Sequence, residues 1–246
     1  MRVAVISDVH ANRQAFEAVL DAADRETVDE IWCLGDVVGY GADPDACTAL
    51  ARERCRICLV GNHDLAVLGA LDISTFSEAA ASAVEWTREN VSEDSLEFMR
   101  GLEPASSHAG IGLFHASPRD PVWEYVLSNE QAEAGLEALR ERVGLIGHSH
   151  VALFFLAPDG EGAGHPEGAQ AGDGAVLPIE RGRWLLNPGS VGQPRDGDPR
   201  AAWLELDLDE LTAAYHRVDY DIEAAARAIR RAGLPDALAD RLQVGR

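Results

Sequence analysis

The chain has 246 residues, 46% of them hydrophobic, which is enough to bury the core of one large domain or two small ones. With 42 acidic and 21 basic residues, its formal net charge is −21, which argues against binding long nucleic acids or an anionic membrane surface. The charge does not exclude a small phosphorylated substrate, because bound divalent ions can reverse the local field.

The first apolar run, residues 3–6, is short and uncharged and predicts a buried strand. No secretory signal or membrane-spanning run precedes it, so we expect a cytoplasmic protein with no membrane partner. Asp8 and His10 follow directly. Because residues i and i+2 of an extended backbone point to the same side, the two side chains can converge on one ion. Taken alone, the pair is equally compatible with a capping aspartate and a surface histidine.

The same pattern, a strand followed by polar side chains, recurs four more times. Helical periodicity or capping residues predict helices between these strands, over residues 12–23, 44–54 and 128–142. Alternating strands and helices indicate an α/β fold with a site at the carboxyl ends of the strands. The predicted strands cover residues 31–34, 56–60, 110–114 and 143–146, and the polar residues that follow them include Asp36, Asn62, His63, Asp64, His115, His148 and His150.

The remaining segments complete the expected architecture. Residues 65–103 read as a helical insertion near the site that could shape substrate access. Residues 157–174, rich in Gly, Ala and Pro, predict a flexible connector between two strands. Residues 201–206 and 211–218 alternate like antiparallel strands, and residues 221–232 predict a final amphipathic helix. We therefore expect one domain over residues 1–246, with two packed mixed sheets flanked by helices.

The polar residues at the strand ends have the chemistry of metal ligands. Carboxylate, imidazole and amide oxygen together suit Mn, Fe or Zn, and no cysteine lies among them. Clustering so many polar groups in a buried place without partners would be costly. A metal site is therefore a better interpretation than a set of structural side chains.

The order of the motifs, D-x-H, G-D, G-N-H-D, H and G-H-x-H, resembles the calcineurin-like metallophosphoesterase superfamily. Residues 115–119 and 187–192 are similar to its small bacterial branch of single-domain phosphodiesterases and phosphatases. The resemblance implies a four-layer α/β/β/α sandwich with a dinuclear metal site on its rim. It also implies hydrolysis of a phosphoester of a small or nucleotide-like substrate by a hydroxide that bridges the two metal ions.

The resemblance assigns the ligands of two divalent ions, expected to be Mn, with Fe, Zn or Ni as alternatives. Asp36 would bridge them, because a carboxylate has two oxygens and a charge to offset two dications. The first ion would be held by Asp8, His10 and His150, and the second by Asn62, His115 and His148.

The resemblance gives His63 a different role, in which it donates a proton to the leaving oxygen or stabilises the charged transition state. Asp64 would hold the ring of His63 in the useful tautomer, cap a helix, or do both. Asn12, Arg119 and Arg195 are candidates for contacting the substrate phosphate. For each arginine, a surface salt bridge is an equally good interpretation.

Two other functions compete with a phosphoesterase. A non-catalytic metal- or nucleotide-binding regulatory protein would not need His63. A nuclease of the same superfamily is disfavoured by the charge of −21 and the lack of a basic stripe. The sequence does not specify the substrate, the native metal or the oligomeric state.

Overall fold

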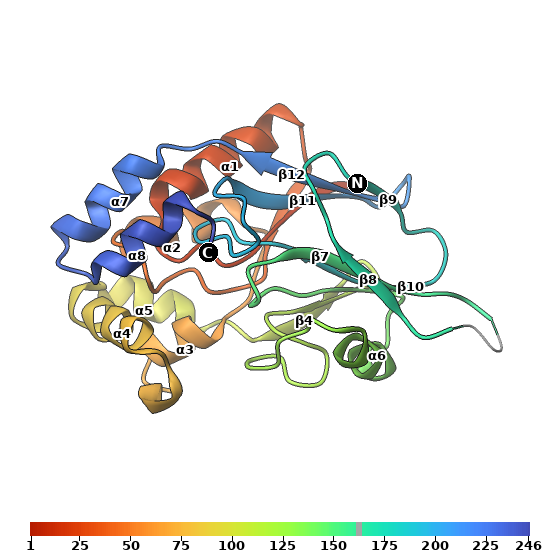
Figure 1. Ribbon diagram of the computed structural model, residues 1–246, viewed down its shortest axis with the longest axis horizontal. Coiled ribbons are helices and arrows are strands. Elements are labelled where there is room, and N and C mark those ends of the chain that lie inside the picture. Colours follow the sequence, from red (N-terminus) through yellow and green to blue (C-terminus); the bar gives the residue numbers. More distant parts are fainter. Residues whose placement is uncertain (161–163) are drawn as a thin grey trace.

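Two six-stranded sheets lie face to face in the computed structural model, which describes residues 1–160 and 164–246 (Figure 1). The first sheet has the order β3 (Ile57–Cys58), β2 (Glu30–Cys33), β1 (Arg2–Ile6), β11 (Ala201–Asp207), β12 (Thr212–Val218) and β9 (Val176–Pro178). The second has the order β4 (Ala105–His108), β5 (Ile111–Phe114), β6 (Val143–Leu145), β10 (Arg183–Pro188), β7 (Ala152–Ala157) and β8 (Glu167–Gln170).

Both sheets are mixed, as predicted. Strands β1, β2 and β3 are mutually parallel, as are β5, β6 and β10, and the remaining pairs are antiparallel. In the centre of the first sheet, β1 pairs with β2 on one side and with β11 on the other, where Arg2 lies opposite Asp207. The carboxyl ends of β1, β2 and β3 therefore meet at one edge of that sheet.

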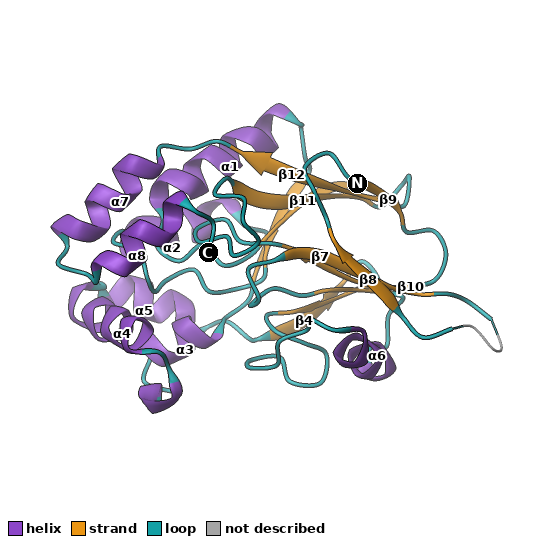
Figure 2. Cartoon of the chain, viewed as in Figure 1, coloured by secondary structure: helices purple, strands orange, loops and turns teal. Residues whose placement is uncertain are grey.

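Alternation along β1 builds two layers of the core. Val3 and Val5 pack between the two sheets, whereas Ala4 and Ile6 face the opposite way, toward α1 (Arg13–Arg25) and α2 (Pro44–Arg54). All four side chains are fully buried, because β1 is covered on both faces. On the far side of the second sheet, α6 (Asn129–Ala138) packs against β7 and β10. The result is the predicted four-layer α/β/β/α sandwich (Figure 2).

A group of helices lies beside the two sheets, at the lower left of Figure 1. The predicted insertion contributes α3 (Asn62–Val67), the 3₁₀ turn η1 (Ile73–Thr75), α4 (Glu78–Asn90) and α5 (Glu93–Arg100). Apolar side chains of α4 pack against α7 (Ile222–Arg231), α8 (Asp236–Asp240) and the turn η2 (Arg241–Gln243). The insertion and the last 25 residues thus form one helical wall next to the predicted site.

The structure differs from the sequence expectations at several elements. Strand β3 has two residues where five were expected. In the predicted connector 157–174, Glu167–Gln170 form the exposed strand β8, while residues 161–163 lie outside the described residues. Helices α8 and η2 and the edge strand β4 were not predicted, because their short sequences have no clear apolar period. In the described part of the chain, no helix has the length and apolarity needed to cross a membrane.

Candidate metal centre and active site

The loops that follow five strands bring the predicted ligands together. Asp8 and His10 follow β1, Asp36 follows β2, Asn62 begins α3, His115 follows β5, and His148 and His150 lie between β6 and β7. Each of these seven residues is at most 4% exposed. Two groups emerge, in each of which the ligand atoms lie within 4.8 Å of one another: Asp8, His10 and His150, and Asp36, His115 and His148.

In the first group, two imidazole rings point at each other. The Nε2 atoms of His10 and His150 are 3.0 Å apart. Their Nδ1 atoms lie 3.1 Å from the main-chain oxygen of Val38 and 2.7 Å from that of Gln193. Because a carbonyl oxygen only accepts, Nδ1 carries the hydrogen in each ring and Nε2 presents a lone pair. Oδ1 of Asp8, 3.3 Å from Nε2 of His150, adds a third electron donor.

The second group repeats this arrangement. Nδ1 of His115 lies 2.9 Å from the main-chain oxygen of Leu34, so its Nε2 also presents a lone pair. That Nε2 is 3.1 Å from Oδ1 of Asn62, which places two acceptors face to face. Asn62, which the resemblance named as a ligand of the second ion, thus lies next to a member of the second group.

Asp36 connects the two groups. Its Oδ2 is 3.6 Å from Nε2 of His10 and 3.6 Å from Nε2 of His115. Its Oδ1 accepts a hydrogen bond of 2.8 Å from the main-chain N–H of His63. The approach requires a glycine at position 61, since a Cβ there would lie 2.0 Å from Oδ1 of Asp36.

These residues fit two divalent cations. Oδ1 of Asp8, Oδ2 of Asp36 and Nε2 of His148 are buried and have no hydrogen-bond partner among the described residues. Buried acceptors left without a partner are costly, and here they converge with facing lone pairs. Cations would satisfy all of them at once, and oxygen with imidazole donors suits Mn, Fe or Zn.

Burial also sets the protonation of the ligands. It lowers the pKa of His10, His115 and His150, and lowers that of His148 to about 3, so these rings are neutral near pH 7. Burial raises the pKa of the Asp36 carboxyl well above its usual value, and the neighbouring Asp64 and Asp8 raise it further. Neutral imidazoles can bind a metal ion without first losing a proton. Several carboxyl groups close together favour binding of a cation between them.

The ligand loops are conformationally strained. Five ligands have positive φ angles between 50° and 63°: Asp8, His10, Asp36, His148 and His150. Residues other than glycine rarely adopt this region, and each instance costs about 1–3 kcal/mol. The turn after β10 holds the first loop in place, since Ser190 Oγ and the N–H of Gly192 both donate to the main-chain oxygen of Asp8.

His63 belongs to neither group of ligands. Its ring packs against Tyr40 and Phe76, with centroids 4.3 Å and 5.1 Å away, and it lines the cavity in front of the ligands. Gly39, whose φ is +92°, lies so close to the ring that a Cβ at this position would be 2.7 Å from the buried Nδ1 of His63. Packing against these three residues therefore fixes the orientation of the ring.

The carboxylate of Asp64 is hydrogen-bonded to the main chain and not to the ring of His63. Its carboxylate accepts hydrogen bonds from the main-chain N–H groups of Gly61, Val37 and Val38. Nδ1 of His63 has no hydrogen-bond partner among the described residues. Asp64 instead caps α3 and ties that helix to the loop after Asp36, which is the alternative role that the sequence left open.

Asn12 and Arg119, two of the three candidates for phosphate contacts, are engaged with other groups of the protein. Asn12 caps α1 through its Oδ1, and its Nδ2 donates to the main-chain oxygen of Gly192 at 2.8 Å, so the side chain is engaged in the scaffold. Arg119 forms an exposed ion pair with Glu124 and does not line the cavity. Arg195, the third candidate, does line it.

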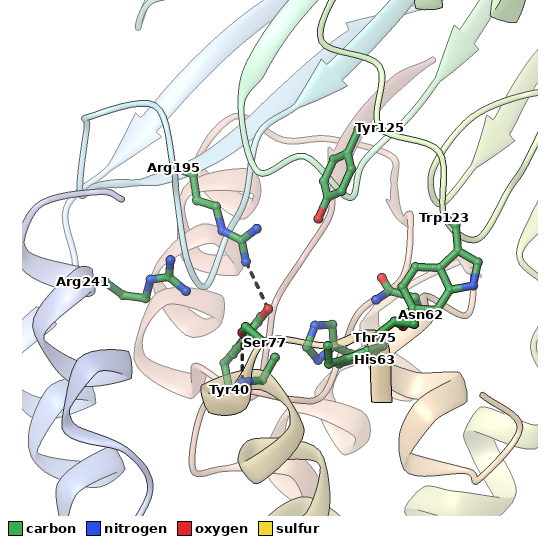
Figure 3. A pocket seen from close by; sticks show the side chains of 11 residues that line it. Tyr40, Asn62, His63, Thr75, Ser77, Trp123, Tyr125, Arg195 and Arg241 are labelled. Atoms are coloured by element: carbon green, nitrogen blue, oxygen red, sulfur yellow. Dashed lines mark hydrogen bonds between the residues drawn. The ribbon is translucent and has the colours of Figure 1, made fainter. Parts of the chain in front are cut away.

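The cavity in front of the metal ligands has a volume of about 460 Å³ (Figure 3). Phe76 of the insertion and Trp123 and Tyr125 of the loop before α6 form an aromatic wall. The ring of Tyr125 stacks on His148, 4.1 Å between centroids. Sequence reasoning missed Tyr40, Trp123, Tyr125 and Arg241, because no strand-end pattern marks them.

Comparisons with known proteins agree with this geometry. The family model of the calcineurin-like phosphoesterase superfamily domain matches residues 1–209. A protein of Methanocaldococcus jannaschii, described as uncharacterised, is 34% identical over 249 aligned positions, which cover 99% of this chain and 98% of that protein.

Among solved structures, a metallophosphoesterase from Sphaerobacter thermophilus is 38% identical, with a TM-score of 0.88, and the match covers 100% of this chain and 99% of that one. A hypothetical protein from Pyrococcus horikoshii shares the fold at 18% identity and a TM-score of 0.77, covering 100% and 98% of the two chains.

Proposed function

The chain belongs to the calcineurin-like phosphoesterase superfamily, and from this premise we propose that it is a dinuclear metal-dependent hydrolase of small phosphate esters. The position of Asp36 carries the proposal. Its Oδ2 is equally far, 3.6 Å, from a histidine nitrogen of each ligand group, which is where a carboxylate shared by two ions would lie.

Seven residues of the chain would hold the two ions. When bound, a pair of divalent ions polarises a phosphoryl oxygen and lowers the pKa of a water molecule, which then serves as the nucleophile. Mn²⁺ is our first choice, since the donors are oxygen and imidazole. Asp8, His10 and His150 would hold the first ion, Asn62, His115 and His148 would hold the second, and Asp36 would contribute to both.

We assign the proton transfer to His63. Its Nδ1 is buried, which leaves Nε2 as the ring nitrogen able to meet a substrate. Burial, with His150 and Arg195 nearby, lowers the pKa of His63 well below its usual value. A phosphate anion in the cavity opposes this effect, so substrate binding favours the protonated ring that can donate to the leaving oxygen.

The cavity supports a small, nucleotide-like substrate. A volume of about 460 Å³ is in the range of small-molecule sites. Its aromatic wall of Phe76, Trp123 and Tyr125 offers flat apolar surfaces against which a nucleobase could pack. A chain with a net charge of −21 repels an anionic ligand except where bound cations offset the local negative charge, as they would at the proposed metal centre.

The proposal is tested by hydrolysis of p-nitrophenyl phosphate and bis(p-nitrophenyl) phosphate by protein reconstituted with Mn²⁺. Asp36→Asn removes the shared charge and preserves the shape of the side chain, so it should lower both the metal content and the rate. Asp94→Asn, at an exposed position of α5, is the matched control and should change neither. Full activity of a metal-free sample, or a normal rate with two ions in Asp36→Asn, would overturn the proposal.

A further inference from the structure

Two arginines lie next to each other at one side of the cavity. Arg195 lies in the turn after β10. Arg241 is the first residue of η2, which belongs to the helical wall. Both donate to the same acceptor, Oε1 of Gln193, at 3.0 Å and 3.1 Å. Figure 3 shows the pair on the side of the cavity opposite Trp123.

The positive charge of this pair is not neutralised by side chains. Neither arginine forms an ion pair with an Asp or Glu in residues 1–160 and 164–246, whereas the nearby Arg200 pairs with Asp173 and Asp198. Within the same ranges, the buried Nε of Arg195 has no hydrogen-bond partner. In a chain with twice as many acidic as basic residues, two adjacent guanidinium groups that face no acidic side chain need a reason.

The hydrogen-bond acceptors of the pair include no Asp or Glu side chain among the described residues. Arg195 donates to the hydroxyl of Tyr40 at 3.3 Å, and Nε of Arg241 donates to the main-chain oxygen of Arg246 at 2.7 Å. Burial lowers the pKa of Arg241, and the charge of Arg195 lowers it further. The two groups therefore repel each other at a place where water is partly excluded, and an anion between them would relieve this cost.

Gln193 links the pair to the metal centre. Its main-chain oxygen lies 2.7 Å from Nδ1 of His150, and the main-chain N–H of Arg195 donates to the oxygen of His150 at 3.0 Å. Gln193 itself is 2% exposed. One buried residue thus sets the position of a metal ligand with its backbone and the position of both guanidinium groups with its side chain.

We propose that Arg195 and Arg241 bind a second phosphate group of the substrate, while the scissile phosphate lies at the metal ligands. This inference rests on the proposed function and narrows its substrate class to esters that carry a phosphate besides the one that is hydrolysed. The planar fork of an arginine matches the geometry of phosphate oxygens, and two forks side by side suit a dianion. Because the main chain of Arg195 is hydrogen-bonded to the metal ligand His150 whereas Arg241 belongs to η2, Arg241 is the residue that discriminates such substrates.

Two chromogenic esters that differ by one phosphate test this inference on the metal-loaded full chain. One is the p-nitrophenyl ester of thymidine 5′-phosphate, and the other carries an additional 3′-phosphate. We expect the wild type to have the lower KM for the ester with the 3′-phosphate. Arg241→Gln should raise that KM by about 10- to 100-fold, the effect of losing a charged hydrogen bond, and change the KM of the other ester by a clearly smaller factor.

Two variants accompany this measurement. Arg241→Lys keeps the charge but not the fork, and should retain part of the preference. Arg231→Gln, at an exposed position of α7, is the matched control and should retain all of it. Melting temperatures of the variants equal to that of the wild type show that the KM effect does not come from misfolding. No preference between the esters in the wild type, or an equal change for both in Arg241→Gln, would overturn the inference.

Calorimetric binding separates a failure of this inference from a failure of the proposed function. Thymidine 3′,5′-bisphosphate should bind the wild type more tightly than thymidine 5′-phosphate does, and Arg241→Gln should remove the difference. If neither ester is hydrolysed but this binding pattern holds, the proposed hydrolysis is wrong and the anion site stands. If the esters are hydrolysed but the two nucleotides bind alike, the anion site is wrong and the hydrolase stands.

Discussion

Nε2 of His10 and Nε2 of His150 lie 3.0 Å apart with lone pairs directed at each other, because the Nδ1–H group of each ring points at a main-chain oxygen. Neither ring can turn its hydrogen toward the other without losing a buried hydrogen bond. The pair is therefore disfavoured without a cation and favoured with one, which ties the stability of the fold to metal binding.

The first prediction concerns this link between stability and metal. Removing metal with a chelator should lower the melting temperature, and Mn²⁺ at about 100 times its Kd should restore about 2.7 kcal/mol, or roughly 5–10 °C for a chain of this size. His150→Ala should lose much of the response to Mn²⁺. The control His165→Ala, in an exposed loop, should keep it. Identical thermal unfolding with and without Mn²⁺ would contradict the prediction.

The second prediction separates His63 from the metal ligands. His63→Gln should leave two ions bound and lower the rate by about 10²–10⁴-fold for an alkyl leaving group, the usual range of acid–base catalysis. The loss should be smaller for nitrophenolate, which needs little protonation. Metal content and turnover are measured together, with His108→Gln as the control. Loss of an ion in His63→Gln would make His63 a ligand, and equal losses for both leaving groups would make it a stabiliser of charge.

The third prediction concerns pH and follows from opposite pKa shifts. Burial raises the pKa of Asp36, so in the metal-free protein this carboxyl keeps its proton above its usual value of 3.8. Burial lowers the pKa of the histidine ligands, so they contribute less to proton release on metal binding than histidines in water would. Binding of Mn²⁺ at pH 6 should therefore release a proton from the carboxyl, and affinity should rise with pH.

Calorimetry in two buffers with different ionisation enthalpies measures this release. The apparent binding enthalpy should differ between the buffers at pH 6, in the sense of proton uptake by the buffer. Equal enthalpies would show that the Asp36 carboxyl is already ionised in the metal-free protein at this pH, which would contradict the prediction.

The fourth prediction follows from the hydrogen bonds of the Asn12 side chain. Asn12→Ala removes the cap of α1 and should lower the free energy of unfolding by about 1 kcal/mol, with a further loss from the buried bond to Gly192. Arg119→Ala breaks only an exposed ion pair and should cost between about 0 and 1 kcal/mol. Urea unfolding measures both. A raised KM in Asn12→Ala at unchanged stability would restore the substrate contact that the sequence suggested.

The sequence predicted the two mixed sheets and the residues that converge at the strand ends, because both depend on local order. A buried strand has a recognisable apolar run, and the residue after it must lie at the edge of the sheet. Asp8, Asp36 and His115 could therefore be placed without knowing what lies between them.

The contacts that the sequence did not indicate involve partners that are distant along the chain. Asp64 and His63 are adjacent in sequence, yet the carboxylate of Asp64 accepts from Val37 and Val38, which no local pattern indicates. Arg241 reaches the cavity only because the last helices pack against α4. Residues placed by tertiary packing of this kind carry no signal in spacing or periodicity.

The pairing of β1 with β11 has a consequence for how the chain is made. Because the partner of Arg2 is Asp207, one edge of β1 has no native neighbour until most of the chain has left the ribosome. At about 5–20 residues per second, that delay lasts roughly 10–40 s. Throughout it, the apolar residues Val3 to Ile6 offer an open strand edge to other nascent chains. Slow translation, which lengthens this interval, will therefore favour aggregation of this protein unless a chaperone shields its first strand.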